Sequence, residues 1–177
     1  MNQPQPQSRS VLRPGILEGV RVTVVGGGPA GLDAELERLG AEVLESPAPE
    51  AATALVFDAS PAFAQGAPEG LMRALEQAWA AVDGVAAQLI AAESPAKVLL
   101  IAPPANAGPQ AGAARAALEN LARTLSVEWA RFQVTSCAIL PGLATSTAQL
   151  RELIAYMLSP AGEYFSGCVL ELGAVTG

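Results

Sequence analysis

Residues 110–142, QAGAARAALENLARTLSVEWARFQVTSCAILPG, decide the fold of this chain. The first part carries small residues on one side and Leu118, Leu121 and Leu125 at helical spacing, so it predicts a helix over 112–130 with apolar residues on more than one face. The second part, 133–140, is largely apolar and ends in Pro-Gly, which is typical of a buried strand. A helix that leads directly into a buried strand indicates an α/β protein.

The rest of the chain repeats this alternation of strand and helix. Residues 20–25, VRVTVV, are almost wholly apolar, as expected of a central parallel strand. The other predicted strands are 42–45, 54–58, 97–102, 133–140 and 168–172. The predicted helices are 32–39, 112–130, 148–158 and a long one within 70–94, with a loop over 59–70. We therefore expect a three-layer, Rossmann-like or flavodoxin-like α/β sandwich, with a parallel sheet of about six strands and helices on both faces.

Length, charge and composition limit the class of protein. The chain has 177 residues, 51% hydrophobic and 15% charged, which suits a compact globular fold. We expect residues 1–15, rich in Gln and Pro, to form a disordered tail and 16–177 to form one domain. The net charge of −7 disfavours nucleic acid and anionic membranes as partners, because phosphate groups need a basic surface. No apolar run has the length of a membrane span or the place of a signal peptide, so we expect a cytoplasmic protein.

The cysteines and the lack of histidine limit metal and redox chemistry. Cys137 and Cys168 lie in separate strand-like runs without C-x-x-C spacing. We interpret them as small buried hydrophobic residues in a reducing compartment, and a redox or nucleophilic thiol is the alternative. The chain has no histidine, which removes the commonest general base and metal ligand. We therefore predict no metal site.

A glycine-rich loop after the first predicted strand is the candidate nucleotide site. Gly26, Gly28 and Gly31 form a G-x-G-x-x-G pattern, in which the backbone can approach a pyrophosphate at a helix N-terminus. Glu45 ends the next predicted strand and is placed like the acidic residue that binds a ribose 2′-hydroxyl. It follows Gly31 by 14 residues, whereas the usual spacing is about 20.

Three details favour a different interpretation of the same loop. Pro29 removes one donor N–H, and Asp33 places negative charge where a phosphate would lie. The helix predicted over 32–39 spans barely two turns. A purely structural strand-to-helix turn is therefore the alternative.

The opening stretch also resembles the most recognisable segment of the short-chain dehydrogenases/reductases. In that family a Tyr-x-x-x-Lys pair opens the helix, and Pro-Gly follows the next strand. Matching residues 115–121, RAALENL, to the family's Lys-Ala-Ala-Leu-x-x-Leu places Arg115 at the lysine position and Ala111 at the tyrosine position. The family's catalytic serine would follow the fourth predicted strand, but no serine occurs between Lys97 and Leu125. The resemblance implies the family's fold without its catalytic Ser, Tyr and Lys.

The loop after residue 140 carries the same resemblance. It is similar to the family's Pro-Gly-x-x-x-Thr, whose hydroxyl helps to hold the nicotinamide, and Ser146 stands at the matching place. A structural interpretation fits equally well, with Thr147 as the N-cap of the helix 148–158. Arg115 keeps a positive charge that could contact a ribose or phosphate. The cofactor-binding candidates are Gly26, Gly28, Gly31, Glu45, Arg115 and Ser146.

Within the family, the resemblance is closest to the non-catalytic, flavodoxin-like N-terminal domain of the high-molecular-weight 3-oxoacyl-acyl carrier protein reductases. Phe57-Asp58-Ala59-Ser60 stands at the family's Asn-Asn-Ala-Gly, and a preceding unit of about 25 to 30 residues is missing. The loss of that unit implies the strand order 2-1-3-4-5-6 in place of 3-2-1-4-5-6. Because the chain ends at Gly177, we expect no reductase domain to follow.

Three functions stay open at this point. The first, which we favour, is a non-catalytic subunit that binds NAD(P) weakly or not at all and pairs with itself or with an active reductase. Pairing would use helices 71–92 and 112–130, because the counterparts of these helices form the family's dimer interface. The second is an NAD(P)-dependent oxidoreductase of the 3-oxoacyl type with a replacement acid, Tyr156 or Tyr164. The third is a sensor that binds a nucleotide without turnover.

Overall fold

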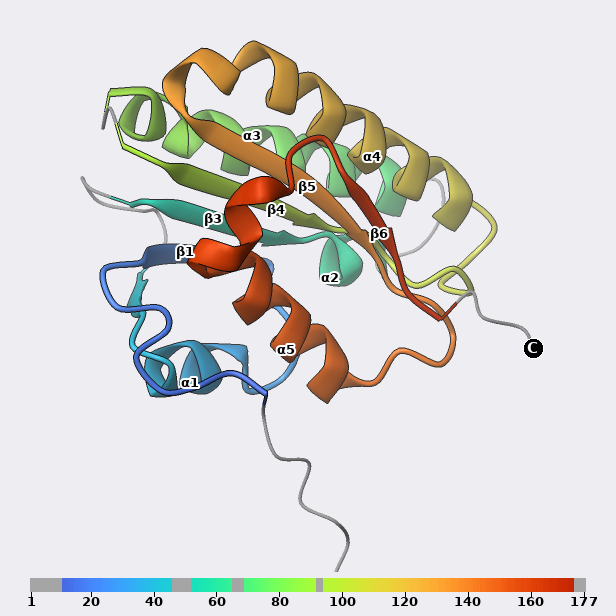
Figure 1. Cartoon of the computed structure of the whole chain (residues 1–177). Helices are drawn as coiled ribbons and strands as arrows, with labels where there is room; N and C mark the ends of the chain where they lie inside the picture. Colours follow the sequence, from blue (N-terminus) through green and yellow to red (C-terminus); the bar gives the residue numbers. More distant parts are fainter. Residues whose placement is uncertain (1–10, 46–51, 65–68, 92–93, 174–177) are drawn as a thin grey trace, which may run out of the picture.

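The computed structural model describes residues 11–45, 52–64, 69–91 and 94–173 (Figure 1). Within these residues the strands are β1 (Arg21–Val25), β2 (Glu42–Leu44), β3 (Ala54–Asp58), β4 (Ala96–Ile101), β5 (Val134–Leu140) and β6 (Val169–Glu171). They form one sheet of order β2-β1-β3-β4-β5-β6, in which all neighbouring strands are parallel. The predicted fold class and strand order are confirmed.

Helices cover both faces of the sheet. They are α1 (Leu32–Arg38), α2 (Ser60–Phe63), α3 (Glu69–Ala91), α4 (Ala111–Glu128) and α5 (Thr147–Leu158), with the short 3-10 helices η1 (Ala130–Phe132) and η2 (Pro160–Tyr164). Figure 1 shows α3 and α4 on one face and α1 and α5 on the other. The sandwich therefore has the predicted three layers.

The short helix α2 corrects the loop that we predicted over 59–70. Pro61 lies in its first turn, where a missing backbone N–H leaves no hydrogen bond unmade. Ala62 and Phe63 are buried on the cluster under α3. Burial of these two side chains favours a helical turn in a stretch whose Ala, Pro and Gly content is typical of a loop.

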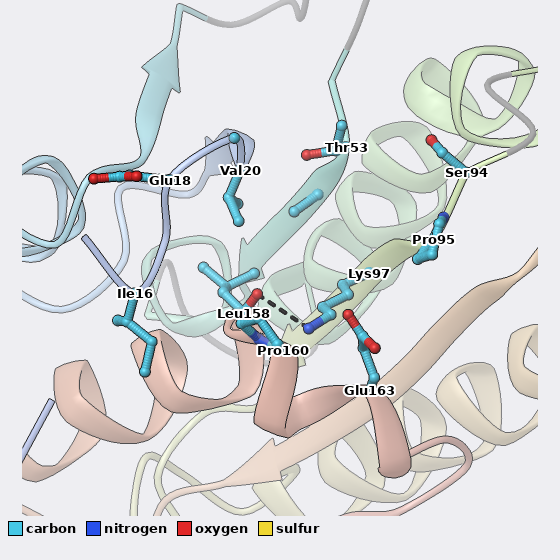
Figure 2. A pocket seen from close by; sticks show the side chains of 12 residues that line it. Ile16, Glu18, Val20, Thr53, Ser94, Pro95, Lys97, Leu158, Pro160 and Glu163 are labelled. Atoms are coloured by element: carbon cyan, nitrogen blue, oxygen red, sulfur yellow. Dashed lines mark hydrogen bonds between the residues drawn. The ribbon is translucent and has the colours of Figure 1, made fainter. Parts of the chain in front are cut away.

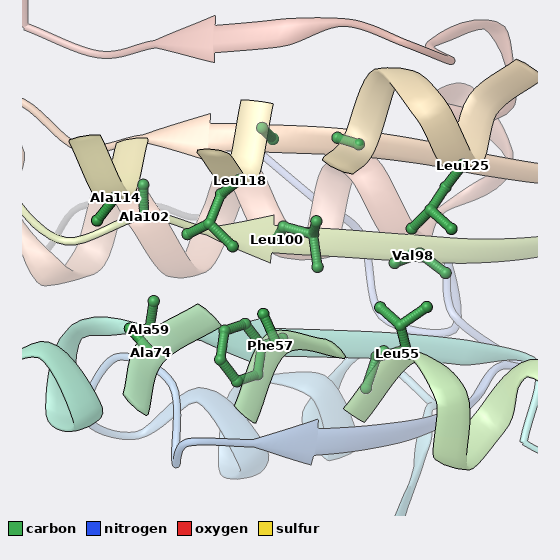
Figure 3. Close-up of a cluster of buried hydrophobic side chains, with 14 of the residues drawn as sticks. Leu55, Phe57, Ala59, Ala74, Val98, Leu100, Ala102, Ala114, Leu118 and Leu125 are labelled. Carbon is green, nitrogen blue, oxygen red and sulfur yellow. The ribbon is translucent and has the colours of Figure 1, made fainter. Parts of the chain in front are cut away.

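The sheet separates two hydrophobic clusters. The cluster under α3 and α4 contains Phe57, Leu100 and Leu118, all fully buried (Figure 3). The cluster under α1 and α5 contains Ile139 and Ile154, which are also fully buried. Because successive side chains on a strand point to opposite faces, the central strands contribute to both clusters and are apolar along most of their length.

The segment before β1 also contributes to the core. Residues 11–19 form turns in which Leu17 is fully buried, and its N–H donates to the Leu39 carbonyl at 3.0 Å. Leu12 and Ile16 pack against the cluster under α1 and α5. Residues 1–10 of the predicted tail lie outside the described residues, so the domain boundary near residue 15 stays a prediction. In the described part of the chain, no helix combines the length and apolar character that crossing a membrane requires.

The core predicts a clear difference between two Leu→Ala substitutions. Leu118 is fully buried, whereas Leu143 is 73% exposed. Leu118→Ala should lower the free energy of unfolding by about 2–5 kcal/mol, because it leaves a cavity between α4 and the sheet. Leu143→Ala should change it by about 0.5 kcal/mol or less. Urea denaturation followed by circular dichroism measures both, and equal losses would contradict the assigned core.

Candidate functional site

The glycine loop lies at the carboxyl end of β1. Gly26, Gly27, Gly28 and Gly31 all have positive φ angles, of 85°, 84°, 61° and 77°. A Cβ on Gly26 would lie 2.1 Å from the backbone oxygen of Asp58, and a Cβ on Gly28 would lie 2.6 Å from the Leu32 side chain. The close approach of the Asp58 backbone therefore requires a glycine at position 26, and the positive φ angles favour glycine at all four positions.

Charges around α1 differ from those of a phosphate site. The helix has seven residues, begins after Gly31, and carries Asp33 and Glu35 in its first turn. A hydrogen bond from Arg38 lowers the pKa of Glu35, so this carboxylate stays ionised beside the positive end of the helix. Arg151 from α5 donates to the Ala30 carbonyl at 2.6 Å. Acidic residues thus lie in the first turn of the helix, whose N-terminus would otherwise favour a phosphate.

Asp58 is a buried acid that the sequence analysis did not select as a candidate. It ends β3, and the strand order reverses between β3 and its neighbour β1, which is where open α/β sheets bind ligands. Its Oδ1 accepts the Ser60 N–H at 2.9 Å, and burial raises the pKa of the carboxyl group. A carboxylate at the end of an otherwise apolar strand was the signal that could have identified it.

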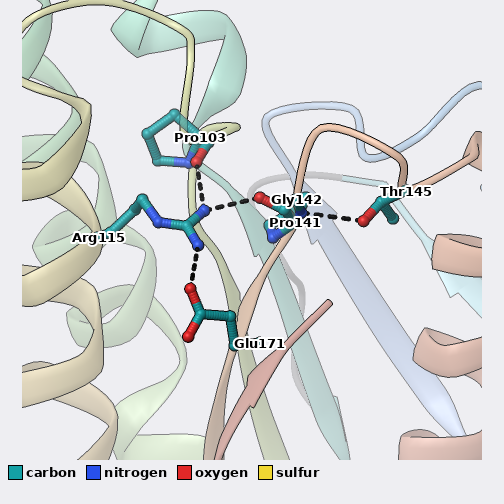
Figure 4. A network of polar contacts seen from close by, with 6 residues as sticks. All are labelled: Pro103, Arg115, Pro141, Gly142, Thr145 and Glu171. Atoms are coloured by element: carbon teal, nitrogen blue, oxygen red, sulfur yellow. Dashed lines mark hydrogen bonds and ion pairs between the residues drawn. The ribbon is translucent and has the colours of Figure 1, made fainter. Parts of the chain in front are cut away.

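Arg115 joins the carboxyl ends of three strands (Figure 4). The residue is only 7% exposed, and its Nη1 donates to the carbonyl oxygens of Pro103 at 3.1 Å and Pro141 at 2.7 Å. Its Nη2 pairs with Glu171 Oε1 at 3.3 Å. The segments after β4 and β5 and the end of β6 are therefore held by one side chain. Its planar guanidinium suits such multiple contacts better than a lysine ammonium would.

The loop after β5 is held by its own side chains. Thr145 Oγ1 accepts the Gly142 N–H at 2.9 Å. Ser146 Oγ accepts the Gln149 N–H at 3.2 Å, while Gln149 Oε1 accepts the Ser146 N–H at 2.9 Å. Ser146 is thus the N-cap of α5, and the prediction that Thr147 caps this helix was wrong. The Ser-x-x-Gln spacing, which forms a reciprocal capping box, explains the difference.

The predicted cofactor-binding residues all follow the carboxyl ends of strands or begin helices there, but their local contacts differ. Gly26, Gly28 and Gly31 belong to one loop, and Glu45 is an exposed residue just after β2. The contacts of Arg115 are with the ends of β4, β5 and β6 and not with the glycine loop. Their role in binding a cofactor stays a prediction.

The position that the resemblance matches to the family's catalytic tyrosine carries no polar side chain. Ala111 is the first residue of α4 and is buried, so its environment offers a methyl group where a phenol would be needed. Tyr156 lies near the C-terminal end of α5 with its ring against Phe165, and Tyr164 is highly exposed on η2. The end of α5 lies at the amino edge of the sheet, because its last carbonyls contact Lys97 near the start of β4. Both tyrosines are therefore at the opposite edge from Arg115.

A second polar feature lies at this amino edge (Figure 2). A cavity of about 300 Å³ is bordered by the starts of β3 and β4, by the residues before β1, and by Leu158, Pro160 and Glu163. The Lys97 ammonium donates to the Leu158 carbonyl at 3.0 Å and to the Ser159 carbonyl. Burial lowers the pKa of Lys97, and the Glu163 carboxylate opposes this change. The lysine thus satisfies the last carbonyls of α5, which otherwise have no helical partner.

Among the residues that the structure describes, no group of three or more His, Cys, Asp or Glu side chains is arranged to hold a metal ion.

Comparisons with known proteins agree on the fold. The chain shares 21% identity with a citronellol catabolism dehydrogenase of Pseudomonas aeruginosa PAO1, at a TM-score of 0.68 over 92% of this chain and 96% of that one. It shares 14% identity with a 3-ketoacyl-(acyl-carrier-protein) reductase from Brucella melitensis complexed with NADH, at a TM-score of 0.70 over 88% and 97% of the two chains. No protein-family model and no curated protein sequence matches the chain. The chain therefore has the Rossmann-like fold of these dehydrogenase and reductase structures.

The glycine loop provides a test of close packing against β3. Gly26→Ala and Gly27→Ala impose similar backbone strain, because both φ angles are near 85°. Only the first brings a methyl group against the Asp58 backbone, since nothing lies within 4 Å of the Gly27 position. Gly27→Ala should lower the free energy of unfolding by about 1 kcal/mol, and Gly26→Ala by roughly 3 kcal/mol or more. Thermal unfolding measures both, and equal effects would show that the Asp58 contact does not require Gly26.

Arg115 and Arg123 provide a matched pair on α4. Arg115→Ala would leave the buried Pro103 and Pro141 carbonyls without their donor, so it should lower the free energy of unfolding by about 2–4 kcal/mol. Arg123 pairs with Glu119 on the exposed side of the helix, and Arg123→Ala should cost about 0.5 kcal/mol or less. Denaturant titrations of both variants test this. If Arg115→Ala lowers the free energy of unfolding as little as Arg123→Ala does, the structural role assigned to Arg115 is contradicted.

Proposed function

We propose that the chain is a relative of the short-chain dehydrogenases/reductases that acts as a non-catalytic subunit. It pairs with itself or with an active reductase of the same fold. The observation that carries the proposal is the pair of residues at the start of α4. Ala111 offers no hydrogen-bonding group at the tyrosine position, and Arg115 at the lysine position is buried and already bonded to two carbonyls and a carboxylate.

Proton transfer is the chemistry that these substitutions remove. In a carbonyl reductase a positioned acid must lie within hydrogen-bond reach of the substrate oxygen. Loss of such an acid typically lowers the rate by about 10² to 10⁴-fold. The Arg115 guanidinium is already bonded to two carbonyls and to the Glu171 carboxylate, so it does not replace a proton donor at a substrate oxygen. Efficient reduction by the family mechanism is therefore not expected of this chain.

The outer faces of α3 and α4 supply the proposed interface. Trp79 on α3 is 62% exposed, Val127 on α4 is 75% exposed, and Met72 on α3 is also largely exposed. Ala113 and Ala116 on α4 are exposed as well, and their small side chains permit close approach of another helix. α4 buries a single stripe of residues within this chain, so its other side, which carries Ala113, Ala116 and Val127 among polar residues, is available to a partner. Large exposed apolar side chains on paired helices are typical of protein interfaces.

The NAD(P)-dependent alternatives rest on a specific observation too. The glycine loop keeps left-handed backbone at each glycine, and open space surrounds the Gly27 position. One structural neighbour of the chain was solved with NADH. An oxidoreductase with a replacement acid predicts nucleotide binding with turnover of 3-oxoacyl thioesters, and a nucleotide sensor predicts binding alone.

Oligomeric state and nucleotide binding together test the proposal. Light scattering at micromolar concentration should give a dimer, and Trp79→Arg should shift it toward monomer because a charge would be buried at the interface. Tyr164→Arg, which changes an exposed aromatic residue on η2, should leave the dimer unchanged. Calorimetric titration with NADH and NADPH should show weak binding or none, and acetoacetyl thioesters should cause no NADPH consumption.

The outcomes separate the versions of the proposal. A pure monomer would exclude the homodimer. The heteromer would then require that an active reductase purifies with the wild-type chain from its own cells. The same reductase should be absent when the Trp79→Arg variant is purified in the same way. Steady NADPH consumption that Gly28→Leu abolishes would instead establish the oxidoreductase, and micromolar binding without consumption would establish the sensor.

A further inference from the structure

The two cysteines, far apart in sequence, lie opposite each other on neighbouring strands. The register between β5 and β6 pairs Ala138 with Val169, so the preceding residues, Cys137 and Cys168, are also opposite. The Ala138 N–H donates to the Cys168 carbonyl at 3.1 Å, as this register requires. The Gly167 N–H donates to the Ser136 carbonyl at 2.8 Å, one residue out of this register, so Gly167 and Cys168 together face Cys137 just before β6. The Ala138 bond therefore holds Cys168 beside Cys137.

Both thiols lie on the same face of the sheet. Cys137 belongs to the hydrophobic cluster under α5, and Cys168 packs against that cluster. Burial, the main cause, raises the pKa of Cys137 to about 11; a backbone hydrogen bond with Cys168 lowers it, while the electrostatic effect of Cys168 and a side-chain hydrogen bond with it raise it. Neighbouring strands are about 4.8 Å apart. That spacing falls within the roughly 4.4–6.8 Å range of Cα separations that a disulfide spans.

We propose that Cys137 and Cys168 form a reversible intramolecular disulfide when the protein meets hydrogen peroxide. Both are free thiols in this structure. The inference is independent of the proposed function, because it concerns only the register of β5 and β6.

The difference in exposure sets the order of the two steps. Cys137 is 1% exposed and donates its thiol hydrogen to the Phe165 carbonyl at 3.1 Å, whereas Cys168 is partly exposed. The Cys168 thiolate therefore attacks peroxide: an S–O bond forms, the O–O bond breaks, and the departing hydroxide takes up a proton to become water. Cys137 sulfur then attacks the Cys168 sulfenic acid. The S–S bond forms, the S–O bond breaks, and a second water leaves with the thiol proton.

The surroundings of the pair favour this intramolecular step. Residues 160–167 fold over the end of α5 and bring the Phe165 carbonyl to Cys137. Burial is the main cause that raises the pKa of Cys137 to about 11, and the Lys97 ammonium on the neighbouring strand β4 opposes it only in small part, so it is proximity and not thiolate character that favours the step. A resolving thiol held opposite the oxidised one reacts before a second peroxide molecule converts Cys168 to sulfinic acid.

Intact-mass measurement of the full chain after peroxide treatment tests the proposal. Wild-type protein should lose two hydrogen atoms per chain, and a thiol reductant should restore the original mass. Digestion without reduction should give one peptide pair that joins Cys137 to Cys168. The oxidised protein should also show a higher denaturation midpoint, because the bond closes the loop between residues 137 and 168 in the unfolded chain.

Single-cysteine variants serve as matched controls. Cys137→Ser should stop at a Cys168 sulfenic acid that a diketone reagent traps, and Cys168→Ser should leave Cys137 as a free thiol at the same peroxide dose. Wild-type Cys168 recovered as sulfinic acid beside an unmodified Cys137 would overturn the proposal. So would a covalent dimer joined through Cys168. The wild-type masses decide the matter even if a variant fails to fold.

Discussion

The buried guanidinium of Arg115 is the contact on which the carboxyl edge of the sheet depends. Strands β4, β5 and β6 end near one another, and the carbonyls of Pro103 and Pro141 would be buried without a donor if Arg115 were absent. A buried charge is costly unless it is paired and hydrogen-bonded, and here two carbonyls and the Glu171 carboxylate meet that condition. Because these contacts use the donors of the guanidinium, the Arg115 side chain stabilises the fold.

If the chain is the non-catalytic subunit that we propose, these contacts explain how the fold is kept without the family's proton donor. At the position that resembles a catalytic lysine, a longer and planar cation reaches across the strand ends. At the position that resembles a catalytic tyrosine, Ala111 is buried and packs into the core under α3 and α4. On that proposal, both positions carry groups that stabilise the sheet in place of groups that would face a substrate. Gly26 in the glycine loop also serves packing, because its missing side chain allows the close approach of the Asp58 backbone.

The sequence was sufficient for the fold because its signals are local. Apolar strands such as 54–58 and helical spacing in α4 determine the elements, and their alternation determines a parallel sheet. The site was less predictable because its contacts join distant residues. Arg115 and Glu171 are 56 positions apart, and neither position indicates the other in the sequence. Ser146 shows a middle case: its Ser-x-x-Gln spacing was a readable capping signal, yet Thr147 was predicted as the cap.

The register in which two strands pair determines which residues, distant in sequence, lie opposite each other. A one-residue shift of β6 against β5 would move Cys168 to the other face of the sheet, away from Cys137, and would also displace Glu171 from Arg115. The β5–β6 register and the Ala138 N–H bond to the Cys168 carbonyl therefore place the ion pair at one end of β6 and the two thiols at the other. Because β6 is a short edge strand of three residues, a covalent bond at its start would act directly on the strand that carries the Arg115 partner.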